Sequence, residues 1–155
     1  MFRDQERFAC ALRALDRRDY GLAESALSQH LAAESLRDDE RVFLLNKRGV
    51  ARIGLERREL ARTDFEAALE LAPAYAPALT NLGNLAFDEG RIDAAIARYE
   101  SAIAADGDYA IAFLNLGAAY KRAGRIAEAV RALRHAQRLE LRASSATVWR
   151  RARPR

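Results

Sequence analysis

The side chains that most often carry acid–base or metal chemistry are few in this sequence, and they are scattered. The two histidines, His30 and His135, lie far apart and form no pair at the three- or four-residue spacing of a helical metal site. Cys10 is the only cysteine, which excludes an intramolecular disulfide and a multi-cysteine zinc site. Asp106 and Asp108 flank a glycine, but a calcium loop needs more oxygen ligands than these two carboxylates supply. The sequence therefore predicts a protein that is not an enzyme and holds no metal or other cofactor.

Side-chain amides recur at a regular interval and are suited to binding another molecule. Asn81 and Asn115 are separated by 34 residues, Lys47 precedes Asn81 by the same interval, and Asn84 lies three residues beyond Asn81. On a helix, residues three apart are neighbours on one side. Because an amide both donates and accepts hydrogen bonds, such a row could bind the backbone of an extended peptide without requiring a particular sequence. The alternative interpretation is that asparagine is simply a soluble residue at exposed helix positions, and the sequence leaves both open.

Basic side chains gather at the C-terminal end. Residues 1–120 contain 15 basic and 20 acidic residues, a net charge of −5, whereas residues 121–155 contain 11 basic and 2 acidic residues, a net charge of +9. This surface suits an acidic protein, a nucleic-acid backbone or an anionic membrane surface. For the first four arginines below, whose spacing places them on one side of a helix, the alternative is a solvated helix face. The arginines of this basic end are Arg131, Arg134, Arg138 and Arg142, followed by Arg150, Arg151, Arg153 and Arg155.

The elements that must position these side chains follow from an internal repeat. When the chain is shifted by 34 residues, its middle section coincides with itself at bulky, glycine and alanine positions. Because glycine inside a helix costs roughly 1 kcal/mol relative to alanine, three glycines in register indicate that two helices approach closely there. The coinciding sets include Leu45, Leu79 and Phe113; Gly49, Gly83 and Gly117; Ala61, Ala95 and Ala129; and Phe65, Tyr99 and Leu133.

Each repeated unit is expected to contain two helices. In the second unit, apolar residues recur at three- and four-residue spacing over 79–86 and again over 92–103, with Glu89-Gly90-Arg91 between them. The glycine favours a turn because it readily adopts a positive φ angle.

The period, the two-helix unit and these residues together resemble the tetratricopeptide repeat family. The third unit is similar to the family pattern at Phe113, Leu116-Gly117, Tyr120 and Ala129, and the second unit shares most of it. The first unit departs from it, since Arg48 and Arg52 stand where the family has a leucine and an aromatic residue. The resemblance implies an all-α fold, a right-handed superhelical array of antiparallel helix pairs.

The repeat divides the chain into five parts. Residues 42–75, 76–109 and 110–143 are the three clear units, and residues 1–41 are expected to form a degenerate helix pair with about four extra residues near Asp38–Arg41. Residues 144–155 are expected to form a short capping helix and a basic tail. Trp149 is expected to pack near Val130 and Leu133 and so close the end of the array.

The resemblance also implies a function. In this family the first helices of successive units line a concave groove that binds extended peptides or a partner helix, and Phe43 and Phe113 lie near that surface as candidate apolar anchors beside the amides. The carboxylate clamp of some family members is not expected, because Phe8 and Leu12 stand at the matching places of the first groove helix. The sequence thus predicts a protein-interaction module, acting as a scaffold, adaptor or assembly factor, whose partner is a protein with an extended or helical segment. The alternatives are nucleic-acid or ribonucleoprotein binding through the basic end and a structural protomer that self-associates into a homo-oligomer.

The composition favours a cytoplasmic location. Charged residues make up 31% of the chain and stand among the first eight residues, so no secretory signal is expected. No apolar run approaches the roughly 20 residues that span a bilayer.

Overall fold

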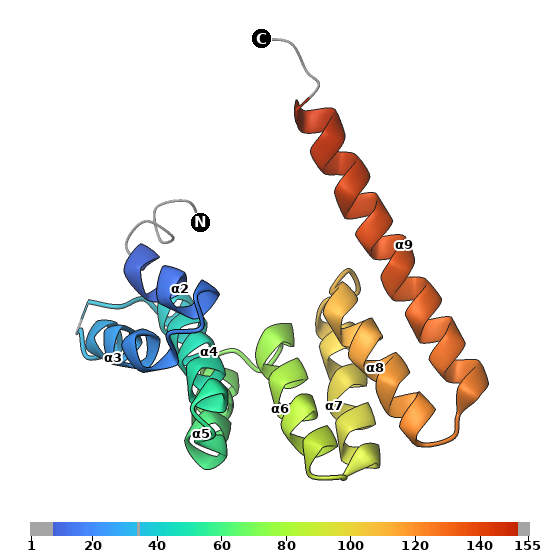
Figure 1. Ribbon diagram of the computed structural model, residues 1–155, viewed down its shortest axis with the longest axis horizontal. Coiled ribbons are helices and arrows are strands. Elements are labelled where there is room, and N and C mark those ends of the chain that lie inside the picture. Colours follow the sequence, from blue (N-terminus) through green and yellow to red (C-terminus); the bar gives the residue numbers. More distant parts are fainter. Residues whose placement is uncertain (1–7, 34, 152–155) are drawn as a thin grey trace. The chain divides into compact units, whose positions relative to one another are not determined.

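The computed structural model describes the backbone of residues 8–33 and 35–151 and the side chains of this part up to Ser145. The described part contains eight helices and no strand, which confirms the predicted all-α class (Figure 1). In chain order the helices are α2 (Ala9–Asp16), α3 (Tyr20–Leu31), α4 (Asp38–Gly54), α5 (Arg58–Leu71), α6 (Ala76–Asp88), α7 (Ile92–Ala105), α8 (Ala110–Arg122) and α9 (Ile126–Arg151).

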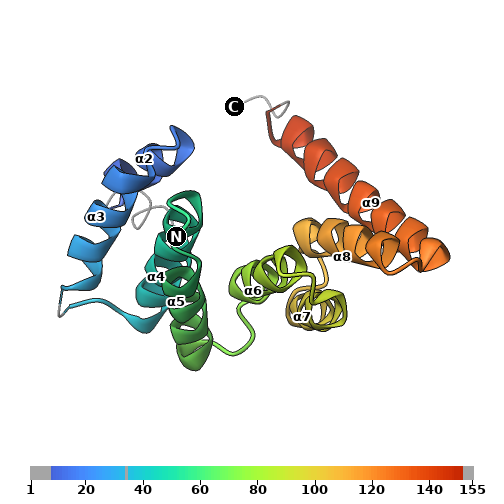
Figure 2. The same cartoon turned by 60° about the horizontal axis from the view of Figure 1, so that its bottom comes forward.

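The helices divide into two compact units, and the boundary between the units in the sequence falls inside α6. The first unit extends to Asn81 and the second begins at Leu82. In the first unit α2 packs on α3, α3 on α4 and α4 on α5; in the second unit α7 packs on α8 and α8 on α9. Neighbouring helices run in opposite directions within each unit (Figure 2). Each unit is therefore built from antiparallel helix pairs with a core of its own.

A left-handed residue reverses the chain inside each helix pair. Gly90 and Gly124 both have a φ of +76°, and Glu56 and Arg18 take the same place with φ values of 61° and 60°. The residues at 56, 90 and 124 are 34 apart, whereas Arg18 precedes Glu56 by 38. The four additional residues form the first turn of α4, which begins at Asp38, so the structure explains the offset of the N-terminal pair.

The glycines in register are sites of direct helix contact, as the sequence predicted. A Cβ atom at Gly83 would lie 2.5 Å from Cε1 of Tyr99, and one at Gly117 would lie 2.7 Å from Cδ2 of Leu133. Gly49 meets the ring of Phe65 in the same way. In these three pairs the second helix thus places a large side chain directly on the backbone of the first.

The C-terminal end differs from the prediction. Residues 146–151 do not form a separate capping helix, because α9 continues without interruption to Arg151. No glycine or proline stands between Leu141 and Arg151 to end the helix, and Ser145 Oγ donates to the Leu141 carbonyl within it. The packing of Trp149 near Val130 and Leu133 stays a prediction. The side chain of Trp149 and residues 152–155 lie outside the described part.

Two glycine-to-alanine substitutions test the close approach of the helices within a pair. We expect Gly83→Ala to destabilise the protein by about 1–3 kcal/mol, because the new methyl group collides with the buried ring of Tyr99. Gly21→Ala is the matched control: it lies in α3 with no atom within 4 Å of the new methyl group, and we expect it to stabilise by up to about 1 kcal/mol. Urea denaturation of both variants measures the difference, and equal effects of the two substitutions would contradict the contact.

Candidate partner-binding surfaces

Two of the predicted amides meet in the second unit. Asn115 Nδ2 of α8 donates to Asn84 Oδ1 of α6 at 2.8 Å, and the same oxygen accepts from the Tyr99 hydroxyl of α7 at 2.8 Å. Burial and the nearby carboxylate of Asp88 raise the pKa of Tyr99 to about 12, so this hydroxyl remains a donor at physiological pH. Three successive helices therefore hold one amide pair in a fixed orientation.

This amide pair retains groups that can bind a partner. In the hydrogen bonds found among the described residues, Asn84 acts only as an acceptor, so its two N–H groups remain available as donors. Asn115 acts only as a donor, so its side-chain oxygen remains available as an acceptor. Both side chains are partly exposed. They line a small recess of about 120 Å³ together with Phe87 and Ala118. The recess thus offers oriented donors and an acceptor beside apolar surface.

The other predicted groove residues are arranged differently. Asn81 Nδ2 donates to Asn46 Oδ1 at 2.9 Å, so its partner is a buried asparagine of α4 and not Lys47. The ammonium group of Lys47 instead lies 5.4 Å from the centre of the Phe43 ring on its own helix, a cation–π contact. The sequence analysis missed Asn46 because it stands one position before the register of the other amides.

Phe113 does not lie beside the amide of Asn115. Residues two apart on a helix point in different directions, and Phe113 turns toward α9, where its ring stacks on His135 at a centroid distance of 4.1 Å. It lines a cleft of about 270 Å³ with Tyr120 and Arg131. Phe113 and the amide pair Asn84–Asn115 thus line different hollows of the second unit. His135, for which the sequence indicated no site, also lines this cleft.

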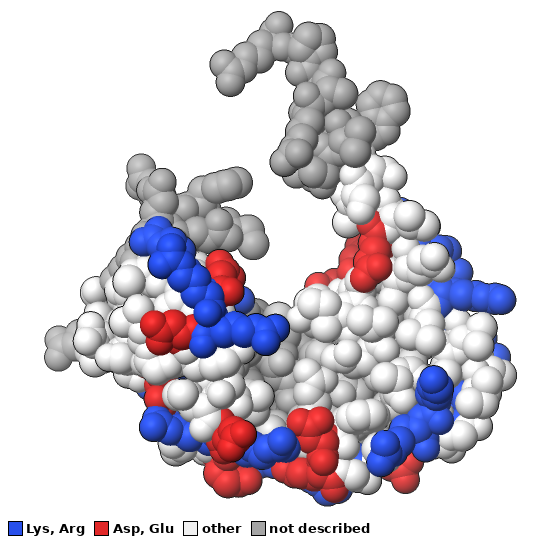
Figure 3. All heavy atoms as spheres, in the orientation of Figure 1, with Lys and Arg blue, Asp and Glu red and all other residues white. Residues whose placement is uncertain are grey.

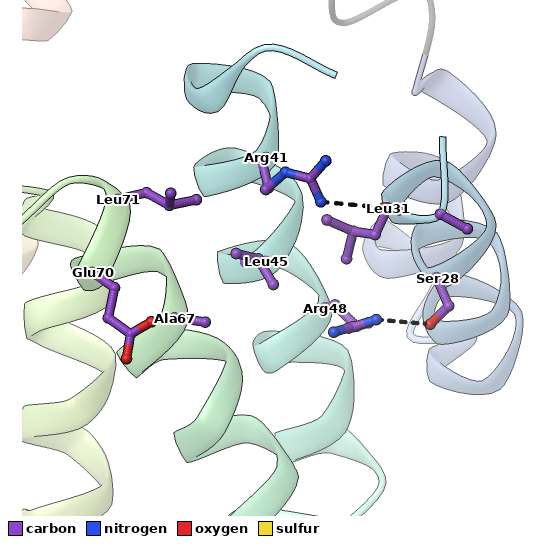
Figure 4. Close-up of a pocket in the computed structure, with 9 residues that line it drawn as sticks. Ser28, Leu31, Arg41, Leu45, Arg48, Ala67, Glu70 and Leu71 are labelled. Carbon is purple, nitrogen blue, oxygen red and sulfur yellow. Dashed lines mark hydrogen bonds between the residues drawn. The ribbon is translucent and has the colours of Figure 1, made fainter. Parts of the chain in front are cut away.

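An equivalent and larger cleft lies in the first unit. It has a volume of about 510 Å³ and lies between α3, α4 and α5, with Leu45 and Arg48 on its floor and Leu71 at one wall (Figure 4). The residues at 45, 48 and 67 correspond, two periods later, to Phe113, Leu116 and His135 of the smaller cleft. Each cleft is thus a feature of the repeat.

The arginines that replace the family's apolar residues are joined to buried carboxylates. Arg48 donates to both oxygens of Asp64 at 3.0 and 2.7 Å, and Arg52 donates to Asp64 at 2.9 Å and to Glu24 at 2.9 Å. The Asp64 side chain is only 3% exposed. Arg57 completes the network on Glu24. Charged hydrogen bonds therefore join α3, α4 and α5 where the third unit has Leu116, Tyr120 and Ala132.

Part of the basic end is visible on α9. Arg131, Arg134, Arg138 and Arg142 are all exposed, and Arg138 approaches Nδ1 of His135 at 3.2 Å. Basic side chains lie along the outer edge of this helix (Figure 3). Arg150 and Arg151 are in the last turn of α9 with side chains outside the described part, as are Arg153 and Arg155 entirely. The described arginines thus form a stripe of exposed side chains on α9.

Metal-binding clusters and membrane-spanning helices are absent from the described part of the chain. No group of three or more metal-binding side chains occurs among residues 8–33 and 35–145. None of the described helices has both the length and the apolar character needed to cross a membrane.

Comparison with known proteins identifies the family. A TPR repeat model matches residues 83–124, and a tetratricopeptide repeat model matches residues 44–75 and 110–141. The chain belongs to the tetratricopeptide repeat family, a family of protein-interaction repeats.

Solved structures with a similar fold have low sequence identity. The crystal structure of MamA is 23% identical, with a TM-score of 0.70 over 87% of this chain and 77% of that one. YrrB, described as a TPR protein with an unusual peptide-binding site, is 23% identical, with a TM-score of 0.63 over 83% and 64%. The second TPR of Spaghetti (RPAP3), bound to the HSP90 peptide SRMEEVD, is 21% identical, with a TM-score of 0.60 over 64% and 92%. These likenesses support the fold of the helical repeat array.

The charged network yields a prediction about stability. We expect Asp64→Ala to destabilise the protein by about 3 kcal/mol, because it leaves Arg48 and Arg52 without their shared carboxylate. Adding Arg48→Leu and Arg52→Tyr restores the residues of the third unit and should recover most of the loss. Thermal denaturation of both variants tests this. A triple variant no more stable than Asp64→Ala would show that the apolar residues of the third unit cannot replace the charged network in the first unit.

Proposed function

We propose that this chain is a non-catalytic protein-interaction module, a scaffold or adaptor, that binds an extended segment of a partner protein at the amide pair Asn84–Asn115. The observation that carries the proposal is the shared oxygen of Asn84, which accepts from both Tyr99 and Asn115 and so fixes the orientation of both amides. An extended peptide presents alternating N–H and C=O groups, which match the remaining amide groups. Because the recess is already formed, little conformational entropy is lost on binding.

Related structures support this proposal. The YrrB structure is described as having a peptide-binding site, and the Spaghetti repeat is bound to a peptide. Both proteins share the helical repeat fold of this chain. A surface formed by successive helices of such an array is therefore a reasonable place for a peptide to bind in this chain as well. A clamp for a C-terminal carboxylate is not part of the proposal, because Phe8 and Leu12 belong to the N-terminal hydrophobic core.

The proposal is tested with peptides selected by phage display against the full chain. We expect the double variant Asn84→Ala/Asn115→Ala to bind a selected peptide at least tenfold more weakly by calorimetry, since each lost hydrogen bond contributes about 1 kcal/mol. Tyr99→Phe should weaken binding less, because it removes only the bond that orients Asn84.

Arg98→Ala is the matched control, an exposed residue of α7 outside the recess, and should bind as the wild type does. Circular dichroism establishes that the variants stay folded. Unchanged affinity in the folded double variant would place the peptide site on another surface of the protein.

A further inference from the structure

The helix pair α8–α9 exposes an apolar face. On α9, Ile126, Val130 and Leu133 recur at four- and three-residue steps and are 58%, 40% and 39% exposed. Leu133 packs on Gly117, which joins this stripe to α8, where Leu114 lies one turn before the glycine and is 47% exposed. Several large apolar side chains of this helix pair are thus exposed to solvent. Single exposed apolar residues are ordinary on a protein surface, whereas a group of them is typical of an interaction site.

The equivalent face of the preceding helix pair is covered. One period earlier, the counterparts of Leu114, Val130 and Leu133 are Thr80, Ile96 and Tyr99, which are only 2%, 5% and 2% exposed. Ile96 and Tyr99 share a core cluster with Leu116 and Ala119 of α8. In this preceding pair, α8 therefore covers Ile96 and Tyr99.

The way α8 covers its neighbour indicates what would fit the exposed face. Its buried residues Ala112, Leu116 and Ala119 follow four- and three-residue steps, so α8 presents a narrow stripe that includes small residues. Residues 146–151 continue α9 as one helix, so no further helix covers this face in the part of the chain that the structure describes. The geometry is thus suited to a single amphipathic helix that supplies a similar stripe.

The charges beside the apolar face indicate which kind of helix would bind there. Lys121 of α8 and Arg134 of α9 are exposed next to the apolar face, and neither forms an ion pair among the described residues. The segment from residue 121 onward has a net charge of +9. The helix α2 of a second copy is a poor match, because Arg13 on its exposed side and Arg17 directly after its last residue would meet like charges.

We propose that the apolar face formed by Leu114, Val130 and Leu133 binds an amphipathic helix of a partner protein that carries acidic residues along its flank. The helix takes the position that the first helix of a further repeat would occupy. This surface is separate from the recess of the amide pair, so the chain would contact partners at two places.

Two labelled synthetic peptides test the proposal with the full chain. The first keeps the buried stripe of α8 and has glutamate at its other exposed positions; the second has lysine at the same positions. By fluorescence anisotropy we expect the acidic peptide to bind at least tenfold more tightly than the basic one. Equal affinity, or no binding of the acidic peptide, would overturn the proposal.

Substitutions on the face provide the second arm. Val130→Glu and Leu114→Glu each place a charge on exposed apolar surface and should weaken binding of the acidic peptide at least tenfold, while circular dichroism shows that the fold is kept. Leu60→Glu is the matched control, because Leu60 is 48% exposed on α5 of the first unit, and it should bind normally. The pair Lys121→Glu/Arg134→Glu should reverse the preference between the two peptides.

The remaining outcomes separate this surface from the others. Asn84→Ala/Asn115→Ala should bind the acidic peptide as the wild type does, so a failure of the amide-pair proposal leaves this one unaffected. Sedimentation velocity of the chain alone is measured across concentration. A dimer that Val130→Glu dissociates would assign the face to a second copy and overturn the assignment to an acidic partner.

Discussion

The structure depends on the close approach of the two helices in each pair. At Gly83 and Gly117 a large side chain of the second helix lies where a Cβ atom of the first would be. Because any larger residue at these places pushes the helices apart, the 34-residue spacing of the glycines sets the spacing of the helix pairs themselves. The amide pair is a consequence, since the ring of Tyr99 that covers Gly83 also carries the hydroxyl that orients Asn84. The contact that holds the pair together thus also prepares its surface.

The first unit reaches a similar arrangement with different chemistry. Arg48 and Arg52 occupy apolar places of the repeat, and they are accommodated because Asp64 and Glu24 stand opposite them on neighbouring helices. Charged pairs of this kind require a defined geometry, whereas apolar side chains tolerate small shifts. The network therefore specifies how α3, α4 and α5 are aligned, in a part of the chain where the family pattern is weak.

The two proposed binding surfaces differ in whether a following helix covers the apolar face of the helix pair. Where a helix pair is followed by another, its apolar face is buried and only polar groups such as Asn84 and Asn115 remain within reach of a partner. At α8 and α9 the same face is exposed, and basic side chains border it. The chemistry of the two proposed surfaces is accordingly different: the first presents oriented amide groups, and the second presents exposed apolar side chains bordered by positive charge.

The sequence by itself determined the all-α class, the two-helix unit, the role of the glycines and the family, because each of these follows from residue type and spacing along the chain. It also singled out Asn84 and Asn115, but it did not show that the Asn84 oxygen accepts from both Asn115 and Tyr99. It did not reveal Asn46 as the partner of Asn81, the turn of Phe113 toward His135, or the pairing of Arg48 with Asp64. Nor did it show that α9 continues to Arg151 and leaves Val130 and Leu133 exposed. These features depend on which side chains of different helices meet, and only tertiary packing decides that, because periodicity assigns a residue to a face of a helix but not to a neighbour.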